Sequence, residues 1–229
     1  MKYFLDGVKY GISYFSILPI KLDYFEANKS FYKGVLYSLP LVGLLLSLIV
    51  VSLYILAPLP QIYKAILCSV LYLFLYGFLH LEAVADTIDG YFASLSKKDV
   101  YEVMKEPYIG SIGAIGTFCF VLLKILALSY LLYLEEFLYI ILTLILSRVT
   151  VFFALQLEFH EKSDFINSLK DSYSSNIILE LILFPIVIST KYILNKLKKN
   201  LGFLNGDTLG FNIEFQEIVL LNIAIILAT

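Results

Sequence analysis

Long apolar runs alternate with short polar stretches along this chain. A helix rises about 1.5 Å per residue, so about 20 apolar residues are needed to cross a hydrocarbon core of about 30 Å. Such runs predict spans at residues 35–57, 61–79, 111–134 and 137–157, followed by a terminal apolar run at 215–229. The pattern therefore predicts an all-α, polytopic integral membrane bundle with about five to seven membrane segments, which forms a single domain over residues 1–229.

Two further apolar segments do not fit ordinary spans. Residues 3–20 are aromatic and are interrupted by two glycines and by Pro19, which predicts an interfacial or half-inserted helix. Residues 177–194 contain Glu180 and Pro185. We predict that this segment does not cross the membrane once, but either enters and returns as a broken helix or lies partly in the interface.

Composition supports the membrane class. Hydrophobic residues make up 60% of the chain and charged residues 16%, far from the proportions of a soluble domain. The net charge of -2 argues against a nucleic-acid partner. Cys68 and Cys119 lie inside apolar runs without metal-ligand spacing, so we expect them to be small buried hydrophobes. Because the first residues lack the basic start and cleavage site of a signal peptide, we expect the spans themselves to drive insertion.

Lysines are distributed unevenly between the loops. The amino-terminal segment, whose polar part 21–33 we expect in water, has five lysines; the polar block 80–110 has three and the loop 158–175 has two. The two intervening loops have one and none. Because cytoplasmic loops carry the excess of lysine, the polar block is predicted to face the cytoplasm from the cell (inner) membrane. A single crossing at 177–194 would break this pattern by placing three lysines outside.

The polar block contains three acids with helical spacing. In a helix, steps of 0, 4 and 7 residues place Glu82, Asp86 and Asp89 on one face about 60° wide. Carboxylates this close repel one another, and a hard divalent ion such as Mg²⁺ is the natural cation to offset them. Gly90 would let a backbone or ligand approach closely, whereas His80 lies on the opposite face and is expected to form a hydrogen bond at the boundary. The alternative is a solvated helix end with ordinary surface acids, which explains a pair better than three acids at a membrane boundary.

Two glycine-containing segments follow the acids. Glu106 precedes a segment that begins at Gly110, whose backbone N–H groups could meet a phosphate at a helix N-terminus. Glycines at this spacing are also typical of close helix packing in membranes, so both interpretations stay open. Nearer the carboxyl end, the Asn-Gly-Asp-Thr-Leu-Gly run at 205–210 predicts a turn that contains Asp207.

Lys124 and Arg148 lie in the middle of predicted spans. An ionised side chain there costs about 2.5–3.5 kcal/mol on insertion scales, so each residue either reaches the interface or faces a polar cavity. Arg148 lies too deep to reach the interface easily. We therefore expect its partner to be an anion or an intramembrane acid.

Taken together, these segments resemble the cobalamin synthase (adenosylcobinamide-GDP ribazoletransferase) family. The matching segments follow the family's order and cover most of the chain: 39–43, 80–90, 104–110, 124–128, 147–148, and 205–210 with Glu214 or Glu217. The chain departs from the family's pattern where Glu82-Ala83 replaces Asp-Gly, Glu106-Pro107 replaces Asp-Ser, and Lys105 replaces Arg. The region 177–194 is also shorter than the family's usual pair of apolar spans.

The resemblance implies a transferase of late cobalamin (vitamin B12) biosynthesis with Mg²⁺ as cofactor. It would join adenosylcobinamide-GDP to α-ribazole or α-ribazole 5′-phosphate and release GMP. The implied metal ligands are Glu82, Asp86, Asp89 and Glu106, and the implied catalytic residues are Glu82, Asp86, Asp89 and Asp207. The implied substrate or phosphate contacts are His80, Gly90, Lys105, Gly110, Lys124 and Arg148. The expected partners are the two substrates and the lipid bilayer, and the sequence leaves open whether the chain forms a homo-oligomer.

Two other functions fit parts of the sequence. The run from Asp86 to Ala93 is similar to the opening of the CDP-alcohol phosphotransferase motif, but that family then has arginine where this chain has Ser94, and the motif's second half is absent. A cation transporter would use Glu82, Asp86, Arg148 and Glu180 inside the membrane. The hydropathy shows no inverted repeat, and the acids gather at one edge rather than at the midplane, which argues against transport.

Overall fold

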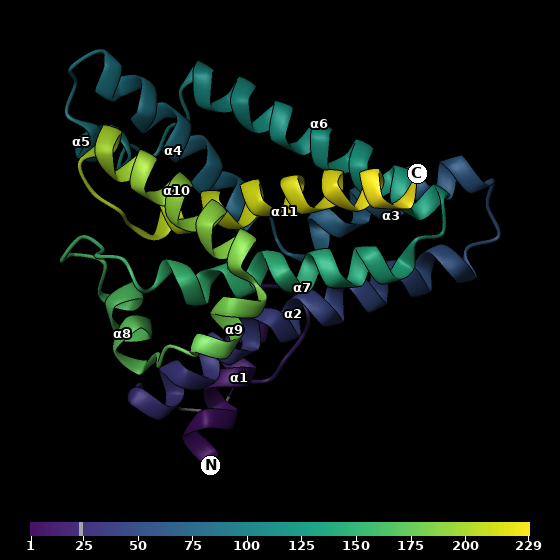
Figure 1. The fold of residues 1–229 in the computed structure, drawn as a ribbon, viewed down its shortest axis with the longest axis horizontal. Coiled ribbons are helices and arrows are strands. Elements are labelled where there is room, and N and C mark those ends of the chain that lie inside the picture. Colours follow the sequence, from purple (N-terminus) through teal and green to yellow (C-terminus); the bar gives the residue numbers. More distant parts are fainter. Residues whose placement is uncertain (23–24) are drawn as a thin grey trace. The chain divides into compact units, whose positions relative to one another are not determined.

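The computed structural model describes residues 1–22 and 25–229, and every regular element in that part of the chain is a helix (Figure 1). The helices are α1 (Lys2–Tyr14), α2 (Lys29–Leu56), α3 (Gln61–Leu75), α4 (Leu79–Leu95), α5 (Val100–Val103), α6 (Ser111–Tyr133), α7 (Phe137–Ala154), α8 (Asp164–Ser172), α9 (Ile177–Ile182), α10 (Phe184–Leu201) and α11 (Gly206–Ala228). The predicted all-α class is therefore confirmed. Asp23 and Tyr24, in the polar stretch expected to lie in water, fall outside the described residues.

Among the described residues, four helices are long and apolar enough to cross a membrane: α2, α6, α7 and α11. The first three match predicted spans, which confirms the polytopic membrane class. Helix α11 begins at Gly206, well before the predicted terminal run. The turn predicted at 205–210 is therefore wrong, because Asn205 caps a helix that starts at the next residue.

The second predicted span, 61–79, takes a different form. Helix α3 has 15 residues, too few to cross alone, and Gly77 and Phe78 after it have positive φ angles of 68° and 58°. This left-handed backbone interrupts the helix; glycine adopts it readily and phenylalanine only with strain. Helices α3 and α4 qualify as a span only when they are taken together as one broken helix. Because α4 carries three carboxylates, which are costly in hydrocarbon, we treat α4 as lying outside the spans.

The chain divides into two compact units. Unit 1 comprises Met1–Phe78, Val121–Val149 and Glu217–Thr229, and unit 2 comprises Leu79–Phe120 and Thr150–Gln216. Helices α6, α7 and α11 each contribute residues to both units. The single domain over residues 1–229 stays a prediction.

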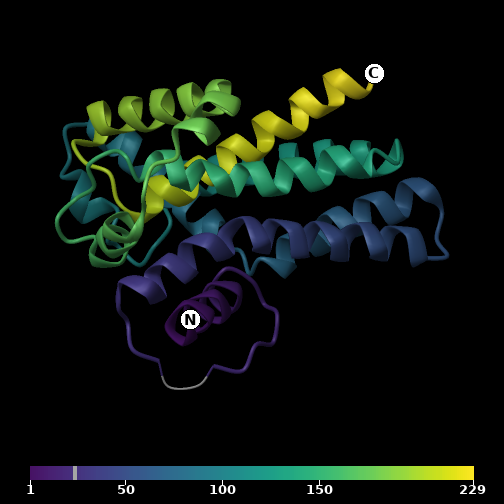
Figure 2. The same ribbon diagram turned by 60° about the horizontal axis from the view of Figure 1, so that its bottom comes forward.

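In unit 1, α1 packs closely on the first turns of α2 (Figure 2). A Cβ added at Gly7 would overlap the carbonyl of Phe31, and one added at Gly34 would overlap the carbonyl of Phe4. Both positions therefore need glycine so that the backbones can approach. Helix α1 has 13 residues and is not among the helices that could span a membrane, as predicted for residues 3–20.

In unit 2, α4 and the start of α11 pack side by side and run in opposite directions. A Cβ added at Gly210 would lie 2.7 Å from the Cβ of Ala83. One turn earlier on α4, His80 lies near Glu214, one turn later on α11, with 3.6 Å between Nδ1 and Oε1. This antiparallel register brings the next turn of α4 toward the first residues of α11.

Residues 177–194 form a broken helix. Helix α9 ends at Ile182 and α10 begins at Phe184 with Pro185 in its first turn, where a proline is tolerated. Neither helix is among those that could span a membrane. The break is as predicted, and the path of this segment relative to the membrane stays a prediction. Of the two cysteines, Cys68 is buried as expected, but Cys119 is exposed. The burial predicted for Cys119 is wrong because it lies on an outward face of α6, where an apolar position can face lipid instead of protein.

Candidate active site

Helix α4 supplies the acidic centre of unit 2. The helical conformation predicted for residues 80–90 is confirmed, and Glu82 is exposed whereas Asp86 and Asp89 are half-buried. The pKa of Asp86 is raised to about 6, first by burial of the carboxyl group and then by the negative charges of Asp207, Glu82 and Asp89. Four carboxylates from two helices therefore lie close enough to repel one another.

Asp207 reaches this group because α11 begins beside it. Asn205 caps the helix: its Oδ1 accepts from the backbone N–H of Thr208 at 3.0 Å, and its own N–H donates to Thr208 Oγ1 at 2.9 Å. The side chain of Asn205 also donates to Asp207 Oδ2 at 2.7 Å, which fixes the direction of that carboxylate. The register of α4 and α11 then places Asp207 near Asp86. Asp207, which was predicted as a site residue, therefore lies with the acids of α4 although it is near the carboxyl end of the chain.

Asp89 is held by the beginning of α6. The backbone N–H of Gly110 donates to Asp89 Oδ2 at 2.7 Å, and that of Gly113 donates to Oδ1 at 2.8 Å. A carboxylate at a helix N-terminus satisfies N–H groups that have no partner within the helix. These donors are the ones predicted to meet a phosphate, and here Asp89 occupies them. The phosphate contact of Gly110 stays a prediction.

Gly90 and His80 lie on buried faces of α4. A Cβ added at Gly90 would lie 2.8 Å from Sδ of Met104, so the close approach predicted at this glycine is made by a methionine side chain. His80 lies next to Glu214 rather than among the acids, as its place on the opposite face predicts. Substrate contacts of Gly90 and His80 stay predictions.

A polar pocket of about 200 Å³ adjoins Asp207 in unit 2. Lys105 and Lys162 line it, and their ammonium groups lie 4.1 Å and 5.4 Å from the ring centroid of Tyr101. His160 also lines the pocket and stacks on Tyr101, with ring centroids 5.1 Å apart. Sequence reasoning found Lys105 but missed Tyr101, His160 and Lys162. His160 is one of only two histidines and lies in a polar loop with Lys162, which is the signal that could have found them.

Lys124 and Arg148 belong to unit 1, where both pair with Glu217. Lys124 Nζ lies 2.9 Å from Glu217 Oε1, and Arg148 Nη1 donates to Oε2 at 2.9 Å. All three side chains are at most 2% exposed. An intramembrane acid was one of the two partners expected for Arg148, and Glu217 is that acid. The phosphate contacts of Lys124 and Arg148 stay predictions.

Tyr72 and Ser147 complete this buried charge cluster. The Tyr72 hydroxyl donates to Glu217 at 2.8 Å and accepts from Arg148 Nη2 at 2.9 Å, and Ser147 Oγ donates to Glu217 at 3.2 Å. The carboxylate therefore receives neutral as well as charged donors, as a buried charge requires. Tyr72 was not predicted as a member of this cluster, because an uncharged tyrosine among apolar residues does not stand out in the sequence.

The residues of the acidic centre suit a hard divalent cation. Within the described part of the chain, no three His, Cys, Asp or Glu side chains are arranged to hold one metal ion, and Glu106 is exposed. Mg²⁺, however, commonly takes only one or two carboxylates and completes its shell with water and phosphate oxygens. The repulsion at Asp86 is what such a cation would relieve. The donor set therefore fits Mg²⁺ together with a phosphate-bearing substrate.

Comparison with known proteins gives one consistent result. Residues 7–225 match the cobalamin-5-phosphate synthase family. Three similar proteins are each named adenosylcobinamide-GDP ribazoletransferase. The protein of Treponema denticola is 37% identical over 124 residues (52% of this chain and 46% of the relative), that of Alkaliphilus oremlandii 29% over 228 residues (90% and 91%), and that of Acinetobacter baumannii strain ACICU 28% over 231 residues (92% and 93%). No solved structure matches the chain.

The family match settles the class to which the chain was expected to belong. It extends over both compact units and includes the acidic centre, the polar pocket and the buried charge cluster. Neither of the other functions considered, phospholipid synthesis and cation transport, is the named activity of these relatives. The chain belongs to the cobalamin-5-phosphate synthase family and is a membrane transferase of cobalamin synthesis.

Proposed function

We propose that this transferase joins adenosylcobinamide-GDP to α-ribazole, or to α-ribazole 5′-phosphate, and releases GMP. The names of the relatives support these substrates. The observation that carries the proposal is the position of Asp207, which lies close to Asp86 and also lines a pocket with two lysines. Attack of a hydroxyl on a pyrophosphate needs a carboxylate to accept the proton and cations to bind the phosphates. Both kinds of group are present here.

Lys105 and Lys162 are the proposed phosphate ligands. Their ammonium groups both approach the ring of Tyr101, which places two positive charges on one small pocket. A lysine is a point charge that cannot form the bidentate fork of an arginine, so two lysines would share the phosphate oxygens. The stacked ring of His160 could donate a further hydrogen bond to the same group.

Mg²⁺ is the proposed cofactor, with Asp86 as its principal ligand. Glu82, Asp89 and Asp207 are the carboxylates whose charges act on Asp86, and they would add negative charge around the ion. When bound, Mg²⁺ would neutralise charge on the pyrophosphate and on the departing GMP. Asp89 already accepts two backbone N–H bonds, so its orientation is fixed before any ligand arrives.

Asp207 is the better placed of the two carboxylates considered as the general base. It lines the polar pocket and is oriented by Asn205, whereas Glu82 is exposed. A base must lie within hydrogen-bond reach of the hydroxyl from which it takes a proton. We propose that Asp207 accepts the proton of the attacking ribose hydroxyl. The distribution of lysines supports a cytoplasmic location for this site, at the inner membrane of the cell.

The proposal is tested with purified protein, adenosylcobinamide-GDP and α-ribazole, by measuring GMP release with Mg²⁺ and with excess chelator. We expect turnover that requires Mg²⁺ and falls at least about 100-fold in Asp86→Asn, because a metal ligand contributes several kcal/mol to the transition state. Glu158→Gln is the matched control, since Glu158 is an exposed acid in the same unit. Full activity in chelator, or in folded Asp86→Asn, would overturn the metal assignment. No GMP release from the wild type with either α-ribazole or α-ribazole 5′-phosphate as the acceptor would overturn the function.

A further inference from the structure

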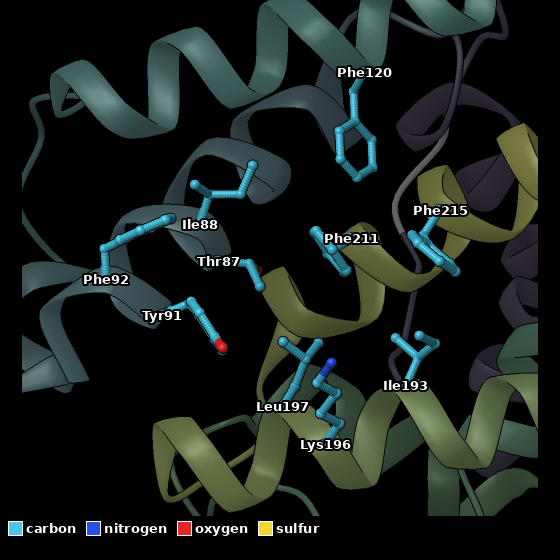
Figure 3. Close-up of a pocket in the computed structure, with 10 residues that line it drawn as sticks. All are labelled: Thr87, Ile88, Tyr91, Phe92, Phe120, Ile193, Lys196, Leu197, Phe211 and Phe215. Atoms are coloured by element: carbon cyan, nitrogen blue, oxygen red, sulfur yellow. The ribbon is translucent and has the colours of Figure 1, made fainter. Parts of the chain in front are cut away.

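A second cavity lies in unit 2 and differs in character from the polar pocket. Its volume is about 290 Å³, and it lies between α4, α6, α10 and α11 (Figure 3). Aromatic rings from three of these helices surround it, among them Tyr91, Phe120 and Phe211. The rings of Phe120 and Phe211 have centroids 5.4 Å apart. Apart from these rings and aliphatic side chains, the wall contains two polar residues, Thr87 and Lys196.

Thr87 differs from the other polar groups of the wall because its hydroxyl is buried. Its side chain is 1% exposed, and its hydroxyl has no hydrogen-bond partner among the described residues. A buried hydroxyl without a partner is unfavourable, and such groups in native proteins call for an explanation. A threonine in a helix can usually bond the carbonyl four residues earlier, which Thr87 does not do. The hydroxyl is therefore available to a ligand in the cavity.

We propose that this cavity binds the aromatic base of the nucleoside acceptor, with the Thr87 hydroxyl donating a hydrogen bond to a ring nitrogen. The inference rests on the proposed function, because that function supplies a nucleoside with a flat base. The base of α-ribazole, 5,6-dimethylbenzimidazole, has two apolar methyl groups and one ring nitrogen with a free lone pair. Aromatic walls stack on such a ring system, and one donor suffices for its one acceptor.

The position of the cavity links the base to the acidic centre. Thr87 follows Asp86 on α4, and Phe211 lies one helical turn after Asp207 on α11. One turn of helix is about 5.4 Å, so the α11 wall of the cavity begins about one helical turn from Asp207, and its α4 wall includes the residue that follows Asp86. A nucleoside whose base lies against Phe211 would therefore place its sugar hydroxyls near the proposed general base.

Size and polarity argue against the other apolar ligands that a membrane transferase meets. A cavity of about 290 Å³ is at the lower end of small-molecule sites, so it suits a bicyclic ring and is too small for a corrinoid. A lipid acyl chain would fit, but it offers no acceptor to the Thr87 hydroxyl. An adenine base has an exocyclic amino group, which would be left unpaired against the aromatic wall.

The test compares Thr87→Val with Thr87→Ser in the full-length protein. Valine removes a buried hydroxyl that has no partner, so we expect no loss of stability. The measurements are the KM for α-ribazole in GMP release and, independently of turnover, α-ribazole binding by equilibrium dialysis. We expect Thr87→Val to weaken both about three- to tenfold, the range that one neutral hydrogen bond supplies, with the KM for adenosylcobinamide-GDP unchanged. Thr87→Ser, which keeps the hydroxyl, should stay near the wild type.

Each other outcome decides the question. Equal α-ribazole binding by the wild type and Thr87→Val, as expected if a lipid chain fills the cavity, would overturn the proposal, and so would a rise only in the KM for adenosylcobinamide-GDP. Equal preference for α-ribazole and its adenine counterpart would contradict the predicted specificity. Binding of α-ribazole that depends on Thr87 without any GMP release would leave the base site standing while the proposed function fails. GMP release with a KM for α-ribazole that is unchanged in Thr87→Val would support the proposed function and overturn the base site.

Discussion

Replacing Glu217 by glutamine removes the negative charge with which both Lys124 and Arg148 are paired. Each pair has an N–O distance of 2.9 Å. With an effective dielectric constant of about 20, Coulomb's law gives a gross attraction of about 6 kcal/mol for each pair. Desolvation offsets much of this, and removing one partner of a buried pair costs about 3–5 kcal/mol, because an uncompensated charge remains. We expect Glu217→Gln to lower the free energy of unfolding by about that amount.

The assay is equilibrium unfolding of the protein in mixed micelles, followed by circular dichroism because the chain has no tryptophan. Glu158→Gln is the matched control: Glu158 pairs with Lys198 at 3.3 Å but is 85% exposed, so its loss should cost at most about 1 kcal/mol. If Glu217→Gln changed stability no more than the control, the buried charge cluster would not hold unit 1 together. The activity per folded molecule of Arg148→Lys then separates its two roles. Full activity would show that Arg148 is structural and does not bind phosphate.

Three further predictions concern the acidic centre and its side of the membrane. The folded pKa of Asp86, about 6, exceeds its ordinary value of 3.8, so the metal-free protein should become more stable as pH falls from 7 toward 4. The exposure of Asp86 reduces this gain in stability to roughly 1 kcal/mol. Thermal melting at different pH values measures the gain, and Asp86→Asn should abolish it. Gly113→Ala should lower GMP release at least about tenfold, because its Cβ would displace Asp89, whereas Glu158→Gln, an exposed change in the same unit, should not. Cysteines placed at positions 97 and 206, after removal of the native pair, should both react with an impermeant thiol reagent from the cytoplasmic side. Flat pH dependence, normal activity of Gly113→Ala, or labelling from opposite sides would contradict these three predictions in turn.

The spans were predictable because their signal is local. An uninterrupted apolar run such as 35–57 contains the information for α2 within itself. The break after α3 was not predictable, since nothing in the apolar sequence before Gly77 indicates that Phe78 also adopts positive φ. The start of α11 was mistaken for a turn because Asn, Gly and Asp favour both turns and helix N-termini.

The acids of the site were predictable to the extent that they share one helix. Asp86 and Asp89 follow helical spacing, so a single segment was enough to group them. Tyr101 lies in a different segment from His160 and Lys162, and only the packing of unit 2 shows that the three line one pocket. Pairing of Arg148 with Glu217 likewise joins residues far apart in sequence. The sequence offered two kinds of partner for this arginine, and it could not show which acid would reach it.

The hydrogen bonds from Gly110 and Gly113 to Asp89 have a consequence for binding order. The two N–H groups can serve one anion at a time. Asp89 is tethered beside them, and a tethered group competes as though it were present at millimolar concentration or above. A substrate phosphate in dilute solution would have to outcompete this internal ligand before it could reach the start of α6. We therefore expect Gly110 and Gly113 to act mainly by orienting the Asp89 carboxylate. The substrate phosphates should contact Lys105 and Lys162 first.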